Sequence, residues 1–277
     1  MKKIVIATDF MESSDGALAY ATFLAEQFNA ELSVVHVYFP VASADPTIPY
    51  ENITPFSLQE DLIDTFESKL KEVVESLKSK KIKATSELVT GSVSSSVSSY
   101  AEDKGADLIV VGKTPENSFF DRLIGSSASD IVKSTSIPVL IVPTASHKPA
   151  FGNIVYGTEL ESEEKEVLGK VFKLAEKLGS KVTLIKVNAD FEPDIQDDNQ
   201  VLADIKKSFP KGRFSFEAVS ADHVSEGLLH AAHTHKADVL VVARHHHNFL
   251  SEIVNPSKSK EIIGKTDIPL LVYDLEA

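Results

Sequence analysis

The chain of 277 residues contains no cysteine, and basic residues are fewer than acidic ones. Without thiols it forms no disulfide, binds no metal through thiolates and has no thiol nucleophile, a composition that suits a reducing compartment. Its 28 Lys and Arg against 41 Asp and Glu give a formal net charge of -13. Nucleic-acid binding without sequence preference depends on neutralising phosphates, so this charge argues against it. Small anions are not excluded, because backbone amides and one or two basic side chains suffice to bind them.

Long apolar runs are also missing. No stretch approaches the roughly twenty residues that a membrane-spanning helix needs. The start of the chain, MKKIVIATDF, has only a short apolar run before Asp9, which predicts a first strand and not a signal peptide. With 43% hydrophobic and 25% charged residues, the chain can bury two cores. We therefore expect a cytoplasmic protein with neither a membrane nor a nucleic acid as partner.

The sequence describes one unit twice. Residues 106–142 are matched without a gap by residues 237–273, so that Gly112 aligns with Ala243 at a separation of 131. Near the start of each copy the separation is 150, and the second copy has therefore lost 19 residues in between. We expect the loss in the connection after the second strand, because residues 39–56 of the first copy carry four prolines and predict a long loop there.

Each copy alternates strands with helices. Short β-branched runs such as KIVIAT and ELSVVHVY read as buried strands, and apolar residues at helical spacing follow them. Ser13 is the expected N-cap of the first helix. Alternation of this kind implies parallel pairing with right-handed crossovers. The predicted fold class is α/β: two tandem open, mostly parallel five-stranded sheets with helices on both faces, Rossmann-like. We place the domains at 1–146 and 150–277.

One loop of the first copy has the residues of an anion site. Gly112 comes directly after the fourth expected strand, and Gly125, Ser126 and Ser127 come directly before the last helix. In open α/β sheets, ligands bind beyond the carboxyl ends of the strands, where glycine lets backbone amides approach a phosphate. Lys113 and Arg122 lie between these positions.

This pattern resembles the universal stress protein family in its tandem form. Nucleotide-binding members carry G-x2-G-x9-G-[ST] at this place, and the chain reads Gly112-x2-Pro115-x9-Gly125-Ser126. Asp9 after the first strand, the pair His36 and Val37 ending the second, and a closing IPVL strand also match, so the resemblance covers nearly the whole chain. It implies a fold of the adenine nucleotide alpha hydrolase type. It also implies that the last strands of the two halves, near Leu140 and Leu271, pair within the chain.

The resemblance implies an adenine nucleotide, ATP or a relative, in the first domain, with Mg²⁺ held by its phosphates and water. The residues carried over for adenosine are Ala7, Thr8, Asp9 and Val37. Those carried over for ribose and phosphates are Gly112, Lys113, Gly125, Ser126 and Ser127. Pro115 departs from the motif and offers no N–H; one lost amide bond to a charged group costs about 1.5–3 kcal/mol, which weakens binding without abolishing it. No catalytic residue is assigned, and any ATP hydrolysis would be slow and incidental.

The second domain lacks the three glycine positions. Ala243, His246 and Pro256 stand there, and Glu159 replaces the aspartate, while Ser257 is kept. Side chains at 243 and 256 would keep a phosphate away from the backbone. We therefore predict a degenerate site in this half, which is left to act as a scaffold, to form a pseudo-dimer with the first half, or to bind something else.

Two other functions stay open. The chain could be a nucleotide-free module that recruits an unknown protein partner, and it could also form a homodimer. Alternatively, a metal or small-ligand site could form in the C-terminal half, where histidines cluster and where His230 and His233 share the i, i+3 spacing of two ligands on one helix face. A solvated helix face explains that spacing equally well. The histidines concerned are His223, His230, His233, His235, His245, His246 and His247. Hydrolase and dinucleotide motifs of the G-x-S-x-G and G-x-G-x-x-G types are absent from the sequence.

Overall fold

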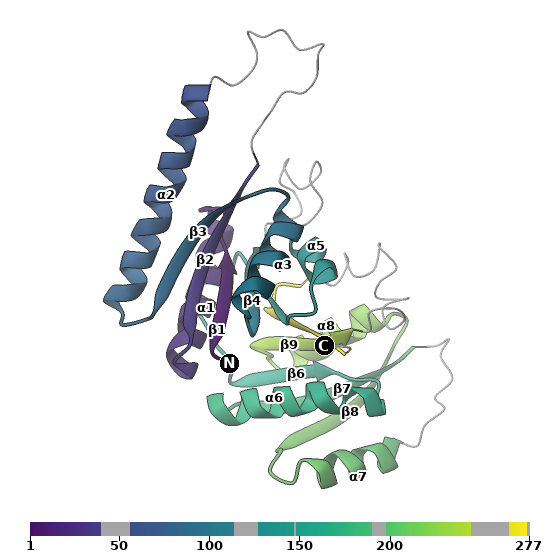
Figure 1. The fold of residues 1–277 in the computed structure, drawn as a ribbon. Helices are drawn as coiled ribbons and strands as arrows, with labels where there is room; N and C mark the ends of the chain where they lie inside the picture. Colours follow the sequence, from purple (N-terminus) through teal and green to yellow (C-terminus); the bar gives the residue numbers. More distant parts are fainter. Residues whose placement is uncertain (40–55, 114–126, 147, 190–197, 245–265, 276–277) are drawn as a thin grey trace.

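A computed structural model describes residues 1–39, 56–113, 127–146, 148–189, 198–244 and 266–275. In the N-terminal half, strands and helices alternate as the sequence predicts (Figure 1). Its elements are β1 (Lys3–Ala7), α1 (Glu12–Phe28), β2 (Glu31–Tyr38), α2 (Phe56–Ser79), β3 (Ala84–Thr90), α3 (Val93–Lys104), β4 (Leu108–Lys113), α5 (Ser127–Ser134) and β5 (Val139–Pro143).

The C-terminal half repeats this order, with a short 3₁₀ turn, η2 (Ser162–Glu164), before its first helix. Its other described elements are β6 (Asn153–Gly157), α6 (Lys165–Leu178), β7 (Lys181–Ala189), α7 (Asp198–Ser208), β8 (Phe214–Ala221), α8 (Val224–Thr234), β9 (Val239–Arg244) and β10 (Leu270–Asp274). Within the described residues, none of the helices has both the length and the apolarity needed to cross a membrane.

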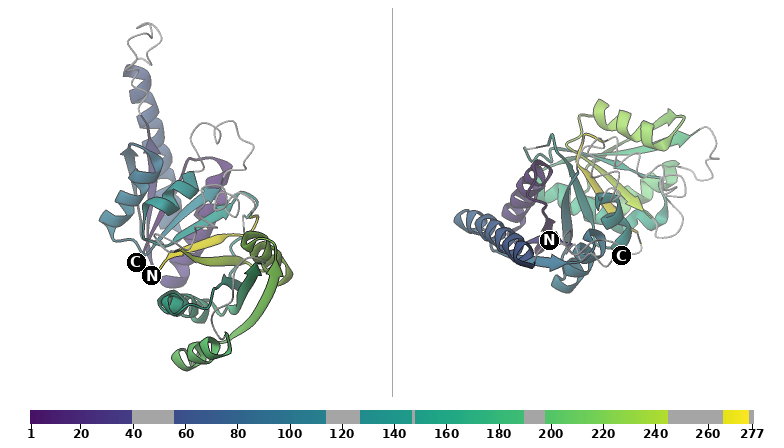
Figure 2. Two further views of the ribbon diagram at one scale, coloured as in Figure 1. Left: turned by 90° about the vertical axis from the view of Figure 1, so that its right-hand side faces the viewer. Right: turned by 90° about the horizontal axis from the view of Figure 1, so that it is seen from above.

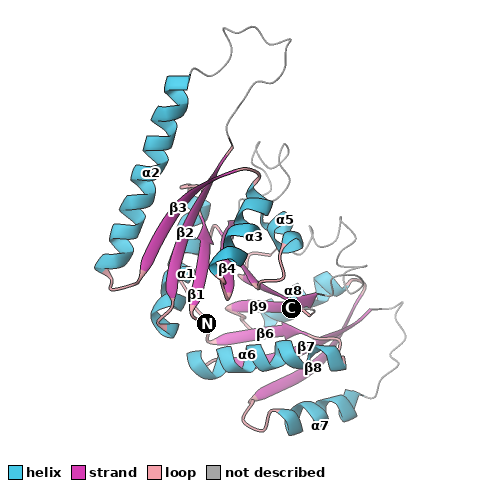
Figure 3. Cartoon of the chain, in the orientation of Figure 1, coloured by secondary structure: helices cyan, strands magenta, loops and turns pink. Residues whose placement is uncertain are grey.

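The two predicted five-stranded sheets join into one ten-stranded sheet, ordered β3-β2-β1-β4-β5-β10-β9-β6-β7-β8 (Figure 3). Neighbouring strands are parallel within each half, and β5 and β10 pair antiparallel at the centre. The α/β class and the mostly parallel pairing are confirmed. The joint also confirms the expectation that the last strands of the two halves pair.

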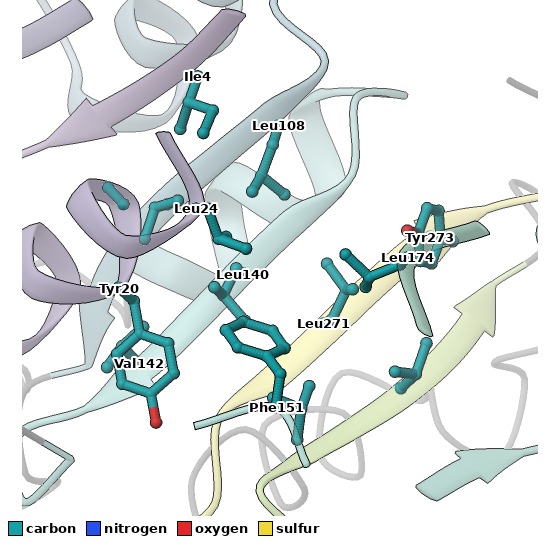
Figure 4. Close-up of a cluster of buried hydrophobic side chains, with 14 of the residues drawn as sticks. Ile4, Tyr20, Leu24, Leu108, Leu140, Val142, Phe151, Leu174, Leu271 and Tyr273 are labelled. Carbon is teal, nitrogen blue, oxygen red and sulfur yellow. The ribbon is translucent and has the colours of Figure 1, made fainter. Parts of the chain in front are cut away.

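The joint has the geometry of a pseudo-two-fold axis. Leu271 lies opposite Leu140, its counterpart in the repeat, with Leu270 opposite Ile141 and Val272 opposite Val139. Leu140 and Leu271 are nearly inaccessible and face the same side of the sheet (Figure 4). Since each closing strand covers the other's edge, neither half exposes an apolar edge strand at this place.

Helices cover both faces of the sheet (Figure 2), and each face has a core that continues across the joint. On one face, α1, α2, α6 and α7 cover Ile4, Leu140, Leu271 and their neighbours. On the other, α3, α5 and α8 cover Val5, Ile141, Leu270 and theirs. Alternate strand residues face opposite sides, which is why consecutive residues of one strand belong to different cores.

The segment that connects the halves packs against the first helix. Phe151 is buried, with its ring 5.7 Å from that of Phe23 and 5.8 Å from that of Tyr20, both on α1. A Cβ on Gly16 of α1 would lie 2.8 Å from the carbonyl oxygen of Ser146, so the connecting backbone lies directly on the helix. The connection is therefore a packed part of the structure and adds a second contact between the halves.

The second copy is 19 residues shorter than the first, and the structure places only part of this loss in the connection after the second strand. We expected the missing residues in the proline-rich connection, but α2 has 24 residues and its counterpart α7 has 11. Much of the loss is therefore a shorter helix. Residues 40–55, which carry the four prolines, lie outside the described part of the chain.

Replacing Leu140 by alanine tests the joint. Loss of a fully buried leucine lowers the free energy of unfolding by about 2–5 kcal/mol, and here it should also uncouple the halves and broaden the urea transition or split it in two. Leu168→Ala is the matched control, because Leu168 of α6 is equally buried but belongs to the C-terminal half alone. Equal losses with equally steep, single transitions would contradict a joint that couples the halves.

Candidate functional site

The residues predicted to bind adenosine lie at the carboxyl ends of adjacent strands. Ala7 ends β1, Thr8 and Asp9 follow it, and Val37 is near the end of β2, which pairs with β1. Gly112 is near the end of β4, which pairs with β1 on its other side. The structure therefore brings these five residues to one edge of the sheet, the edge at which open α/β sheets bind ligands.

The carboxylate of Asp9 is bound within the turn that starts α1. It accepts hydrogen bonds from the backbone N–H of Met11 at 2.9 Å, the hydroxyl of Ser13 at 3.2 Å and the hydroxyl of Ser14. The backbone N–H of Asp9 donates to the oxygen of Ser14 at 2.9 Å. Ser13 is not the N-cap that the sequence suggests, because the helix begins at Glu12 after Met11. Asp9 thus stabilises the turn, and its carboxylate is already hydrogen-bonded.

His36 holds the ends of β1 and β2 together. Its ring N–H at Nδ1 donates to the carbonyl oxygen of Thr8 at 2.7 Å. The ring centroid lies 4.7 Å from that of Phe10 and 4.4 Å from that of Phe66 on α2. Burial lowers the pKa of His36, although the bond to Thr8 opposes this shift, so the imidazole is neutral around neutral pH. The bond between β1 and β2 therefore gives a structural reason for a histidine at position 36.

Ala7 and Val37 form part of an apolar floor. Both are half-buried and pack on the core under α3 and α5, together with Val89 at the end of β3 and Val93 at the start of α3. All four side chains are small; three lie near the carboxyl ends of neighbouring strands, and Val93 lies at the start of the helix that follows β3. We call these four residues the apolar floor. Small apolar side chains grouped in this way suit a planar ring system.

Gly112 has a structural reason to be glycine. A Cβ at this position would lie 2.0 Å from the carbonyl oxygen of Ser13 and 2.6 Å from its carbonyl carbon. The sequence argument assigned the missing side chain to the approach of an anion, but the nearest group is the first turn of α1. In the second half, Ala243 is buried at this position, and there a 3₁₀ turn precedes α6.

Lys113 is directed toward the other half of the chain. Its ammonium donates to the carbonyl oxygen of Thr266 at 2.9 Å, and its own carbonyl accepts from the hydroxyl of Thr144 at 2.8 Å. In this arrangement it serves the joint between the halves. Gly125 and Ser126, with Pro115 and Arg122, lie outside the described residues, and Ser127 is seen only as the first residue of α5.

The start of the second half keeps the turn but changes its chemistry. Phe10 and Leu160 correspond and have left-handed φ angles of 59° and 61°. In the first half, the hydroxyl oxygen of Ser14 accepts a hydrogen bond from the backbone N–H of Asp9. In the second half, the carboxylate of Glu164 takes this role: it accepts from the backbone N–H of Glu159 at 2.8 Å and from the hydroxyl of Thr158 at 2.7 Å. Glu164 is 3% exposed, and this burial raises its pKa. A buried carboxylate therefore holds the turn in the half that lacks the glycines.

The second half packs differently at the equivalent strand ends. Gly157 corresponds to Ala7, and a Cβ there would lie 2.8 Å from a methyl group of Leu228. Leu228 is buried on α8, at the place where α3 has the smaller Val97. A Cβ on Gly227 would lie 2.7 Å from a methyl group of Val187, the counterpart of Val37, so α8 lies directly on the end of β7. Leu228 therefore takes the space of the Cβ that Gly157 lacks, while Gly157 and Val187 remain half-buried, as Ala7 and Val37 are.

The histidines of the second half form separate pairs with carboxylates. His233 lies 3.1 Å from Asp267, and His235 lies 2.9 Å from Glu217. Within the described ranges, no three His, Asp or Glu side chains come together in a way that could hold a metal ion. His245, His246 and His247 lie outside those ranges, as do Pro256 and Ser257.

Comparison with known proteins identifies the family. The family model described as the universal stress protein family matches residues 1–143 and again residues 150–274. Universal stress protein MJ0531 of Methanocaldococcus jannaschii is 30% identical over 142 residues, which is 51% of this chain and 81% of the relative. Universal stress protein YxiE of Bacillus subtilis is 27% identical over 149 residues, 50% of this chain and 97% of the relative.

The solved structures agree on the fold. A crystal structure of a universal stress protein from Archaeoglobus fulgidus aligns with 98% of this chain and 96% of its own, with a TM-score of 0.78 at 16% identity. With the family model matched in both halves, the chain belongs to the universal stress protein family, in its tandem form. The resemblance noted in the sequence is confirmed.

Gly112→Ala tests why this position is glycine. Because the new methyl group meets the backbone of Ser13, the variant should lose about 1–3 kcal/mol of unfolding free energy with no nucleotide present. Ala243→Gly, the counterpart, opens space and gives the backbone more freedom, at a cost of about 1 kcal/mol. Urea denaturation measures both. A Gly112→Ala variant as stable as the unmodified protein would show that α1 does not need the glycine.

Glu164→Gln tests the buried carboxylate. Because the folded protein raises the pKa of Glu164, it favours the protonated acid, and stability is lost as pH rises from the unfolded-state value through the folded-state one. Glutamine has no charge to desolvate, so the variant should gain stability relative to the unmodified protein between about pH 4 and about pH 7. Urea titrations across this range measure the difference in unfolding free energy between the variant and the unmodified protein. For Glu163→Gln, at an exposed neighbouring position, this difference should not change with pH. A flat difference for Glu164→Gln would refute the assignment.

Proposed function

We propose that this chain is a stress-response or signalling protein that binds ATP or a related adenine nucleotide in its N-terminal half only, in the cytoplasm. The adenine base would lie on the apolar floor, with the phosphates toward the loop that begins after Lys113. The domains would be 1–146 and 150–277. The observation that carries the proposal is that Ala7, Val37 and Gly112 lie together at the carboxyl ends of adjacent strands, in the half whose sequence also keeps Gly125 and Ser126 of the motif.

The chemistry of the floor supports a nucleobase. Small apolar side chains accept a planar ring, and the ends of parallel strands lie beside the amino terminus of the next helix, which favours the negative phosphates. The spacing of Gly112, Gly125 and Ser126 matches the motif of nucleotide-binding members of the family. These three positions and the floor lie on the same half of the chain, so one ligand could use both.

The groups near the floor do not favour catalysis. Asp9 is hydrogen-bonded to two hydroxyls and one backbone N–H, and His36 donates its Nδ1 proton to a carbonyl in a buried, neutral state. His36 is also buried against the rings of Phe10 and Phe66, so neither group is presented to a ligand as a general base. Binding with at most slow, incidental hydrolysis is therefore the expected behaviour, with Mg²⁺ on the phosphates.

The bound nucleotide would act through the surface around it. A ligand changes a protein's conformation only as far as it binds one state better than another. In this proposal, occupancy changes the surface around the nucleotide, and an unidentified protein partner recognises the change. The alternative, a nucleotide-free interaction module, is the reading that remains if no nucleotide binds.

Ala7→Leu tests the floor. The larger side chain should occupy the space of the base and weaken ATP binding at least about tenfold, a loss of about 1.4 kcal/mol in binding free energy. Ala218→Leu adds the same atoms at an exposed position of β8 and should leave the affinity unchanged. Isothermal titration calorimetry with ATP and Mg²⁺ measures both.

Two results would contradict the proposal. If millimolar ATP gives neither heat nor a thermal shift with the unmodified protein, the nucleotide-free alternative holds, since even a weak ligand stabilises the folded state. If Ala7→Leu binds ATP as well as the unmodified protein does, the floor is not the site of the base.

A further inference from the structure

Arg244, the last residue of β9, reaches from the C-terminal half into the N-terminal half. Its Nη2 donates to the carbonyl oxygen of Thr135 at 2.6 Å and lies 2.7 Å from Oδ2 of Asp274. Arg244 and Asp274 are only 7% and 4% exposed. Removing either charged side chain would leave the other as a buried charge without a partner, which is costly. A buried ion pair whose arginine also binds a backbone carbonyl is therefore a specific contact.

The carbonyl that Arg244 binds lies at the end of a helix. Thr135 follows Ser134, the last residue of α5, and its hydroxyl accepts a hydrogen bond from the backbone N–H of Ile137 at 3.1 Å. The carboxyl end of a helix presents unpaired carbonyls with a partial negative charge, so a cation there is favourable. Arg244 therefore fixes the carboxyl end of α5 from the other half of the chain.

The same contact occurs in reverse across the pseudo-two-fold axis. Lys113 is the counterpart of Arg244, and it donates to the carbonyl oxygen of Thr266, the counterpart of Thr135. In both turns the threonine hydroxyl accepts from the backbone N–H two residues later, at 3.1 Å. Each half thus uses the basic residue at the end of one strand to bind the turn before the closing strand of the other half.

Helix α5 is short and packs along one side on the core and on α3. It has eight residues, about 12 Å in length. Ala128, Ile131 and Val132 pack on the core, and Ser134 makes a 2.6 Å hydroxyl contact with Ser98 on α3. Because a helix this short is close to rigid, a shift at its carboxyl end is carried to its amino end, which begins at Ser127, one of the residues predicted to bind the phosphates.

We propose that Arg244 is a positioning residue for the phosphate end of the nucleotide site in the other half. The inference rests on the proposed function, and it gives the C-terminal half a role in binding although its own sequence lacks the glycines of the motif. Arg244 touches no nucleotide. It acts by holding α5, and its effect is therefore confined to the phosphates and spares the base.

The test compares ATP with adenosine, which lacks phosphates. Calorimetry on Arg244→Gln should show ATP binding weakened about tenfold or more and adenosine binding unchanged within about twofold. Arg244→Lys, which keeps a cation, should recover most of the ATP affinity. Because Arg244→Gln leaves Asp274 buried and unpaired, the double variant Arg244→Gln with Asp274→Asn serves as a second, neutral version and should show the same selective loss.

Lys186→Gln is the matched control. Lys186 on β7 pairs with Asp198 at 2.6 Å, in a partly buried ion pair that lies wholly within the C-terminal half. The control should leave both affinities unchanged. Hydrogen exchange without nucleotide gives an independent measurement: the amides of residues 131–137 should exchange faster in Arg244→Gln than in Lys186→Gln.

Failure of this inference can be told apart from failure of the proposed function. If the unmodified protein binds ATP and Arg244→Gln keeps the same ratio of ATP to adenosine affinity, the positioning role is refuted and nucleotide binding stands. An equal loss of both ligands would indicate general loosening and also refute it. If the unmodified protein binds no ATP, the nucleotide site fails and the positioning role fails with it, whatever the exchange experiment shows of α5.

Discussion

The antiparallel pairing of β5 with β10 is the interaction on which the rest of the structure depends. Each half alone would end in an apolar strand with unpaired backbone groups, and pairing satisfies both edges at once. The cores on the two faces then run through the joint without a break. The reciprocal bonds of Lys113 and Arg244 reinforce this pairing close to the strand ends. One sheet with two related halves is the consequence.

The halves use the same backbone plan for different purposes. In the first, small side chains leave the ends of the strands partly open, and serine hydroxyls with Asp9 hold the turn into α1. In the second, Leu228 and Gly227 of α8 pack closely on Gly157 and Val187, and a buried glutamate holds the turn. The two halves therefore reach the same backbone course with different side chains.

Much of the architecture could be predicted from the sequence because it depends on local patterns. Periodic apolar residues marked the strands and helices, and the repeat marked the two halves. The joint was expected from the resemblance to the universal stress protein family. The length of α7 was missed because the sequence comparison locates a deletion only to an interval. Proline content then suggested the loop, and it carries no information about how long the neighbouring helix is.

The site was predicted less completely, since its details depend on contacts between distant segments. Nothing near Gly112 in the sequence indicates that the backbone of Ser13 lies against it. Nothing near Lys113 indicates that its ammonium donates a hydrogen bond to the carbonyl oxygen of Thr266. The roles of Leu228 and Arg244 likewise appear only when α8 and α5 are in place. Ser13 and Ser14 lie four and five residues after Asp9, and their hydroxyls bind its carboxylate. This was a local sequence signal for the turn, and we wrongly interpreted Ser13 as an N-cap.

The packed connection through Phe151 bears on how such a protein can evolve. With both halves in one chain, their association does not depend on protein concentration, because the second half is always present at a high effective concentration near the first. A dimer of identical subunits must accept every substitution on both sides of its axis. A covalently joined pair is free of that symmetry, so one half can change its chemistry while the other keeps its own.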